Sequence, residues 1–160
     1  MATDMFLKMQ PLKGESQAKD HKGEIEIHSW HWGVSQDGTT HIGTGGGSGK
    51  VSVQDVTFTH FIDCASTGLL QACTTGKHFD EALLTCRKAG GDNPVEYLKI
   101  KFTNVIVSNV MSGGSSHEER VSENFTLNFQ KFEHIYAQQD AKGVGSPGTP
   151  FKWDITGTQS

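Results

Sequence analysis

The sequence predicts a mainly β protein, folded as a bent β-barrel or a curled pair of sheets with one short α-helix at its flank. Three observations support this class. Apolar residues alternate with polar ones over much of the chain, the alternation changes phase within three segments, and glycine accounts for 19 of 160 residues. A phase change inside a strand requires an inserted residue, and such bulges bend strands. Three bent strands are typical of a barrel or a strongly curled sandwich.

The alternation places the strands along the chain. A first strand is expected over residues 5–10, where apolar positions recur at every second residue before a proline. A polar stretch with two glycines, residues 13–23, follows as a loop. Alternation resumes over residues 24–34, the second strand. Long strands are also expected at residues 83–88 and 95–111, the latter as one strand or two segments.

The second strand shows the phase change most clearly. Its apolar positions are Ile25 and Ile27 and, after the change, Trp30 and Trp32. An inserted residue near His28 explains the change and turns the side chain of residue 31 away from the two tryptophans. Equivalent changes separate Val53 from Val56 and Phe129 from Phe132.

One helix is predicted, and its ends are marked by residue type. Ser66 or Thr67 is expected at the N-cap, residues 69–75 continue the helix, and Gly76 suits the left-handed position that ends many helices. At barely three turns the helix is stable only when packed. We expect Cys73 on this helix to act as a small buried apolar residue rather than a nucleophile.

The chain is expected to form a single domain over residues 1–160, because it contains neither an internal repeat nor an interdomain linker. Residues 35–50 are expected as an extended glycine-rich loop, and residues 140–150 as a Gly/Pro-rich loop near the C-terminus. Loops as long as the first are uncommon and are usually functional or disordered, and we favour contact with another protein. Phe151 and Trp153 are expected to pin the tail to the body.

Composition excludes several classes of function. The formal net charge is −4, with 14 Lys and Arg against 18 Asp and Glu, so a strong binder of nucleic-acid phosphates is not expected. No apolar window is long enough to predict membrane insertion. The N-terminal residues lack the pattern of a secretory signal, and three unpaired cysteines suggest folding in a reducing compartment. From the residues alone, a cytoplasmic location follows.

The sequence offers no set of residues for catalysis, a cofactor or a metal. Residues 43–50 are similar to a phosphate-binding loop, but Thr44 stands where that motif needs glycine and Val51 where it needs a hydroxyl. The eight histidines lack metal-ligand spacing. We therefore expect no enzyme activity and no cofactor. A small hydrolase stays a weak alternative that rests only on scattered Ser, His and Asp.

Trp30 and Trp32 leave a second alternative open. Two residues apart on one strand face, they can form a stacking platform for sugars or bases in a freestanding ligand-binding barrel. Core packing is favoured, because the chain is acidic and no Lys or Arg is interleaved with them.

Seven motifs together resemble a known family. They are KGES at residues 13–16, SWHWG at 29–33, GGGSGK at 45–50, ACTTGKH at 72–78, RKAGG at 87–91, VEYL at 95–98 and ENFTLNF at 123–129. In this order and spacing they resemble Hcp (haemolysin-coregulated protein), the tube subunit of bacterial type VI secretion systems. The resemblance extends from Met5 to about Trp153.

The resemblance implies a homohexameric ring that stacks into a tube. A contractile sheath of TssB and TssC, seated on a baseplate, would propel the tube outward with a VgrG spike at its tip. Effector proteins would travel in the lumen. The protein would be cytoplasmic before firing and then extracellular, without a cleavable signal peptide.

The resemblance also implies roles for particular residues. The glycine-rich loop would contact neighbouring subunits or the next ring, through His41, Gly45, Gly46, Gly47, Ser48 and Lys50. Ser29 and His31 match the segment near the lumen wall, and we expect His31 to face the lumen.

Overall fold

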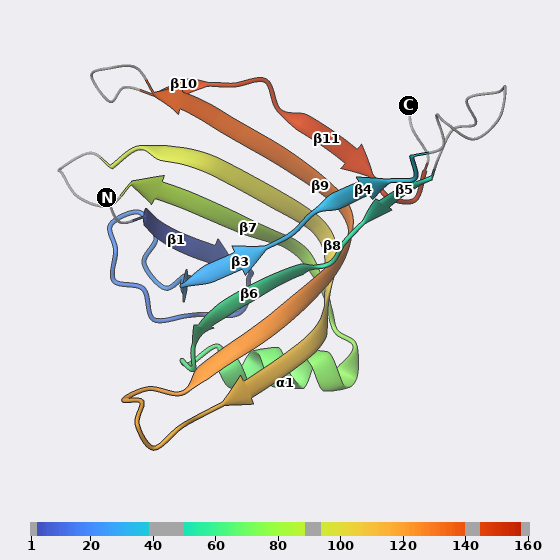
Figure 1. Cartoon of the computed structure of the whole chain (residues 1–160). Helices are drawn as coiled ribbons and strands as arrows, with labels where there is room; N and C mark the ends of the chain where they lie inside the picture. The colour runs from blue at the N-terminus through green and yellow to red at the C-terminus, as the bar shows by residue number, and fades with distance from the viewer. Residues whose placement is uncertain (1–2, 39–49, 89–93, 140–144, 158–160) are drawn as a thin grey trace, which may run out of the picture.

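The computed structural model describes residues 3–38, 50–88, 94–139 and 145–157, which form an antiparallel barrel with one helix (Figure 1). In chain order the elements are β1 (Thr3–Lys8), β2 (Ile25–Ile27), β3 (Ser29–His31), β4 (Val34–Gln36), β5 (Val51–Val53), β6 (Val56–Phe61), α1 (Ser66–Thr75), β7 (His78–Lys88), β8 (Glu96–Gly113), β9 (Ser122–Gln139), β10 (Gly145–Pro147) and β11 (Phe151–Asp154). The predicted class, a mainly β barrel with one short helix, is confirmed.

The barrel closes through a single residue. The main sheet runs in the order β2-β1-β7-β8-β9-β6-β3, so β2 and β3 lie at its two ends. Only His28 separates them in the chain, and its N–H donates to the Thr59 carbonyl on β6 at 2.8 Å. The predicted insertion near His28 is thereby confirmed. It does more than bend one strand, because the chain changes its pairing partner from β1 to β6 at this point.

At the other two phase changes the chain also changes the strand with which it pairs. Between Val53 and Val56 the chain passes from β5, which pairs with β4 in a separate two-stranded ribbon, to β6 in the main sheet. The ribbon projects from the barrel at the upper right of Figure 1. Within β9 the pairing partner changes from β6 to β11 around Gln130, opposite Asn104, whose φ of 55° locally distorts β8.

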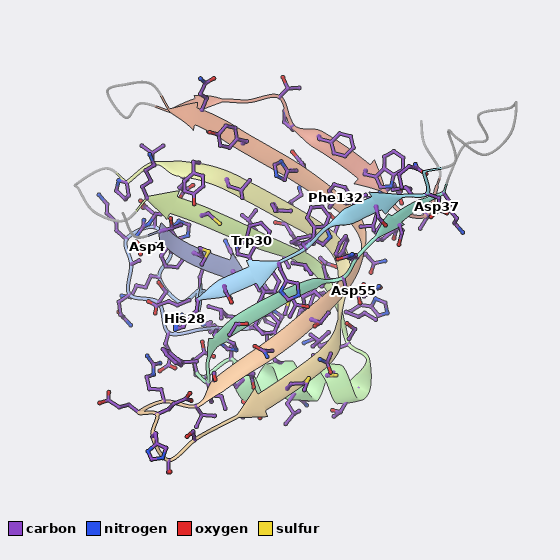
Figure 2. The ribbon with its side chains drawn as sticks, in the orientation of Figure 1. Asp4, His28, Trp30, Asp37, Asp55 and Phe132 are labelled. Carbon is purple, nitrogen blue, oxygen red and sulfur yellow. The ribbon has the colours of Figure 1, made fainter. Side chains whose placement is uncertain are left out.

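The core is formed by the inward residues of every long strand. In β6 the buried positions alternate strictly, with Val56, Phe58 and His60 inside, and β9 continues the pattern with Phe125 and Leu127. Phe58 and Phe125 stack with 5.2 Å between ring centroids. Side chains crowd the space between the strands in Figure 2. Burial of apolar area, at about 25 cal/mol per Å², supplies the main stabilisation of such an interior.

Helix α1 ends as predicted but begins differently. Gly76 adopts φ 69°, and its N–H donates to the Ala72 carbonyl. The prediction of a Ser66 or Thr67 N-cap is wrong, because the N-cap is Ala65 and no side chain bonds to it as a cap. Asp63 compensates in part, because its Oδ1 accepts from the Ala65 N–H at 2.9 Å. Cys73 is half-buried against the core rather than fully buried.

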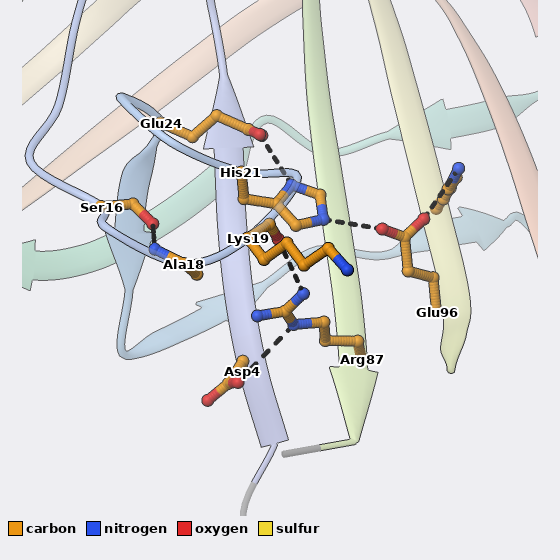
Figure 3. Close-up of polar contacts among 9 residues, drawn as sticks. Asp4, Ser16, Ala18, Lys19, His21, Glu24, Arg87 and Glu96 are labelled. Atoms are coloured by element: carbon orange, nitrogen blue, oxygen red, sulfur yellow. Dashed lines mark hydrogen bonds and ion pairs between the residues drawn. The ribbon is translucent and has the colours of Figure 1, made fainter. Parts of the chain in front are cut away.

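The loop over residues 13–23 is fastened by a buried polar cluster (Figure 3). His21 places Nδ1 2.6 Å from Glu24 and Nε2 2.7 Å from Glu96 of β8, and its ring stacks on Phe6 at 4.5 Å. Arg87 of β7 donates to the Lys19 carbonyl at 3.1 Å. The polar loop thus covers the outer side of β1 and β7. For this reason Phe6 is buried, although its side chain points away from the barrel core.

Two predicted loops are partly strands. Residues 35–36 belong to β4, and residues 145–147 form β10, which pairs with residues 137–139 of β9. Three-residue strands are too short to show a period in the sequence, so only their pairing reveals them. The predicted attachment of the tail is confirmed for Trp153, which pairs with Phe132 and packs on the core, whereas Phe151 is 55% exposed.

Candidate functional site

The outward side of β3, β6 and β9 carries a continuous set of small polar side chains. Two cross-strand rows form it: Ser29, Thr59 and Asn124 in one, and His31, Thr57 and Thr126 in the other. We call these six residues the polar face. None of them is Asp, Glu, Lys or Arg, and none lies in the buried core.

The polar face follows from strict alternation in the two long strands. Each threonine or asparagine stands between buried residues, as Thr57 stands between Val56 and Phe58. Thr57 and Thr126 share a hydrogen bond between hydroxyls at 3.0 Å, and Thr59 donates to Asn124 Oδ1 at 2.8 Å. Cross-strand pairs of this kind stabilise a sheet and hold short side chains close to its surface. The result is a surface on which four of the six side chains are paired by hydrogen bonds and none is Asp, Glu, Lys or Arg.

The carboxylate of Asp55 borders the polar face. Asp55 lies at the junction of β5 and β6 (Figure 2). It accepts hydrogen bonds from Asn128 Nδ2 at 2.8 Å and from Ser108 Oγ at 3.2 Å. Ser108 is the extra residue that shifts the register of β8 against β9. The carboxylate therefore fastens the irregular part of β8 to the barrel.

The outward side of β7, β8, the second half of β9 and β11 has the opposite character. Its cross-strand rows contain Lys101, Glu133 and Lys152 in one line and Glu81, Thr103, Lys131 and Asp154 in the next. We call this set the charged face. Its ion pairs are long, at 4.0 Å for Lys101–Glu81 and 3.8 Å for Lys131–Asp154. Exposed pairs contribute little to stability, so the charges define a surface rather than support the fold.

The two lumen candidates, Ser29 and His31, lie together on the polar face and are exposed. Trp30, between them, points inward opposite Phe58. Trp32 meets Phe102, Phe129 and Phe132 edge-on. Both tryptophans are half-buried against the core, which confirms the core interpretation. The expected turn of His31 away from them is also confirmed.

The predicted contact loop falls mostly outside the described residues. His41, Gly45, Gly46, Gly47 and Ser48 lie there, whereas Lys50 is exposed directly before β5. The ribbon of β4 and β5 leads to this segment. Its base is closed by a hydrogen bond from the Gln54 N–H to the Gly33 carbonyl at 3.0 Å, and Trp32, packed against the core, donates from Nε1 to the Gln54 carbonyl at 2.8 Å.

An apolar trough of about 390 Å³ lies between the ribbon and β11. Its lining includes Trp32, Val34, Val53, Phe132, Phe151 and Trp153. Val34 is 49% exposed and Phe151 55% exposed. Contiguous exposed apolar surface of this kind marks interaction sites in soluble proteins.

Sequence reasoning missed four members of the polar face, Thr57, Thr59, Asn124 and Thr126. The alternation of threonine with buried residues in 56–60 and 123–127 was the available signal. Among the described residues, no group of three His, Cys, Asp or Glu side chains is arranged to hold a metal ion. In the same part of the chain, no helix has the length and apolar character needed to cross a membrane.

Comparison with known proteins agrees with the motifs. The profile of the family described as "Type VI secretion system effector, Hcp" matches residues 6–136. The chain is 49% identical over 156 residues to protein hcp1 of Pseudomonas aeruginosa, covering 97% of this chain and 96% of that protein. The solved structure of a type six secretion system protein superposes with a TM-score of 0.92 at 28% identity, covering 99% of both chains. Hcp1 from Salmonella typhimurium gives 0.78 at 36% identity, again covering 99% of both.

Proposed function

The chain belongs to the Hcp family of type VI secretion proteins, and from this premise we propose that it is a structural subunit of the secretion tube. Six copies assemble head to tail into a ring, and rings stack into a tube with an open lumen. Hcp is a family of structural, secreted proteins. In this role the protein acts by assembly and not by catalysis, with no cofactor.

The contrast between the two outward faces carries the proposal. A lumen through which folded cargo moves needs a surface without fixed charges that would hold particular partners. The polar face offers short hydroxyl and amide side chains that already bond to one another. We assign this face, with Ser29 and His31, to the lumen. The charged face then lies outside, where Lys and Glu side chains are suited to contacts with the sheath.

The ribbon and the trough support contacts between copies of the chain. A heterologous contact that closes makes a ring, and one that repeats along an axis makes a tube. The trough presents apolar surface that a neighbouring subunit can bury. The segment containing His41, residues 45–48 and Lys50 connects β4 to β5 in the sequence, and we assign it to contacts with adjacent subunits or with the next ring.

The other partners follow from the same role. The tube carries effector proteins in its lumen, bears a VgrG spike at its tip, and is driven by a TssB/TssC sheath from a baseplate. The protein is cytoplasmic before firing and extracellular afterwards. Neither nucleic acid nor membrane insertion has a part in this function.

Mass and shape of the purified protein test the proposal together. Light scattering is expected to give about 104 kDa, six times the 17.4 kDa chain, with negative-stain images of the same peak showing rings with an open centre. A compact particle with the mass of one chain at high protein concentration contradicts the proposal and favours a freestanding barrel.

A further inference from the structure

One histidine is completely enclosed at the end of the barrel where β6 stops. His60 is 0% exposed, and its ring lies edge-on against Phe125 with 5.2 Å between centroids. Its Nε2 is 2.8 Å from Glu123 Oε1 on β9. Its Nδ1 is 3.7 Å from Asp63 Oδ2 and, within the described part of the chain, has no hydrogen-bond partner.

The charge balance of this cluster favours a proton on the imidazole. The side chains of Asp63 and Glu123 are 8% and 5% exposed, so both carboxylates are largely removed from water. Among the described residues, His60 is the only cationic group paired with either of them. A neutral imidazole would leave two buried carboxylates without compensation, which is costly in a medium of low polarity.

The pKa of His60 reflects this balance. Burial alone would lower it, but the carboxylates of Asp63 and Glu123 outweigh that effect and raise the pKa above its usual value. Other ionisable groups lie at this end of the barrel. The Cys64 N–H bonds to Glu15 at 3.1 Å, and His28 and Arg120 lie against Phe61 on the outward side. Glu15 and Glu26 line the same surface pocket as Asp63.

Three segments meet at the cluster of His60, Asp63 and Glu123, so the strength of its ion pairs affects more than one contact. His60 stands opposite Glu123 in the pairing of β6 with β9. Asp63 accepts from the Ala65 N–H where α1 begins, and its own N–H donates to Ser66 Oγ at 3.0 Å. The Ile62 N–H donates to the Val121 carbonyl at 2.9 Å, at the end of the β8–β9 turn.

We propose that His60 is a proton-dependent latch, whose charged ring ties the end of β6 to the start of β9 and of α1, and whose loss of the proton loosens this end of the barrel. The positive charge of this cluster comes from a histidine, which can lose its proton. A permanently charged side chain at this position would keep the contacts at every physiological pH. The latch is a property of each subunit, so it operates whether or not rings assemble.

The direction of the pH dependence follows from linkage. A histidine whose pKa is raised by folding contributes its full stabilisation below the unfolded value of about 6.5. The contribution is lost as the pH rises through the higher folded value. The end of the barrel is therefore closed at mildly acidic pH and loosens toward alkaline pH.

Hydrogen exchange of the intact protein between pH 6 and pH 9 tests the latch, with labelling times scaled for intrinsic exchange. Protection of peptides covering residues 60–66 and 120–125 is expected to be lost progressively as the pH rises across this range, while peptides from β7 and the first half of β8 change little. In His60→Gln the same peptides are expected to be weakly protected at every pH.

A second variant keeps the test decisive if His60→Gln does not fold. Glu123→Gln retains the shape but removes one carboxylate charge, so the loss of protection should move to lower pH. His28→Gln changes an exposed histidine at the same end and should leave the profile unaltered. Protection that does not vary with pH in the wild type, or a transition that stays in place in Glu123→Gln, would overturn the proposal.

Discussion

The indole of Trp32 meets the ring of Phe132 edge-on, with 4.7 Å between ring centroids and 74° between the ring planes. Trp32 follows β3, and Phe132 lies in the part of β9 that pairs with β11. The same indole donates to the Gln54 carbonyl at the base of the ribbon. One side chain thus connects the core, the apolar trough and the projecting ribbon.

Truncation of this side chain should be strongly destabilising. We expect Trp32→Ala to lower the free energy of unfolding by about 3 kcal/mol, the lower part of the range for large aromatic residues, because the indole is only partly buried. Urea denaturation, followed by circular dichroism, measures this loss of unfolding free energy. The matched control is Phe151→Ala in the same trough, where a ring that is 55% exposed should cost less than about 1 kcal/mol. Equal losses in the two variants would contradict this account.

Gly14 is required by a close approach of two backbones. A Cβ at this position would lie 2.5 Å from the Glu24 carbonyl oxygen and 2.6 Å from Ile25 Cα. Gly14→Ala should therefore push the loop away from β2 and cost about 1–3 kcal/mol, as overpacking does elsewhere. The unfolding temperature of Gly14→Ala should be compared with that of the control Gly38→Ala, whose Cβ would meet nothing within 4 Å. A variant as stable as wild type would show that the loop can shift freely.

Glu96 should make the fold sensitive to acid. Burial would raise the pKa of this carboxyl, but hydrogen bonds with Lys99 and His21 outweigh it and lower the pKa. Its stabilisation is present above about pH 4.3, the usual glutamate value, and is lost as the pH falls through the lower folded value. Glu96→Gln should be less stable than wild type at pH 6 by up to about 1 kcal/mol, given its partial exposure.

The pH dependence separates this effect from simple loss of packing. Urea midpoints of wild type and Glu96→Gln should converge when both are measured below the folded pKa of Glu96. A difference that stays constant from pH 6 into strong acid would mean that the carboxylate charge has no part in fastening the loop over residues 13–23.

Removal of Gly43–Gly49 tests the assignment of the contact segment. The ribbon base is held by Trp32 and Gln54, outside the deleted residues, so the barrel should keep its unfolding temperature. Stacking of rings should weaken, and tubes in negative-stain images should be shorter than those of the wild type. Tubes of undiminished length would show that this segment is not the stacking element.

Local patterns predicted much of the fold. Alternation located the long strands, the shift at His28 located the point of barrel closure, and Gly76 located the end of the helix. These features depend on neighbours in the chain. The N-cap was misplaced because the Ser66 hydroxyl accepts from the Asp63 N–H, which precedes the helix, instead of capping the first turn.

Local patterns could not predict the polar face or the latch, because both depend on pairing between strands that are far apart in the sequence. Ser29 and His31 become part of a surface only when β3 pairs with β6 and β6 with β9, across separations of about 30 and 65 residues. In the same way, His60 and Glu123 meet only through strand register. Pairing between distant strands is set by the whole barrel, so no short segment contains it.

The position of the polar face in an assembled ring is the most direct test of the account. Ser29→Cys, in a Cys64→Ser background that removes the exposed native thiol, can carry a maleimide-gold label, and rings can then be imaged in negative stain. Lys152→Cys on the charged face is the matched control and should place gold at the outer rim. The account predicts that the Ser29→Cys label appears at the centre of the ring; a label at the rim would contradict it.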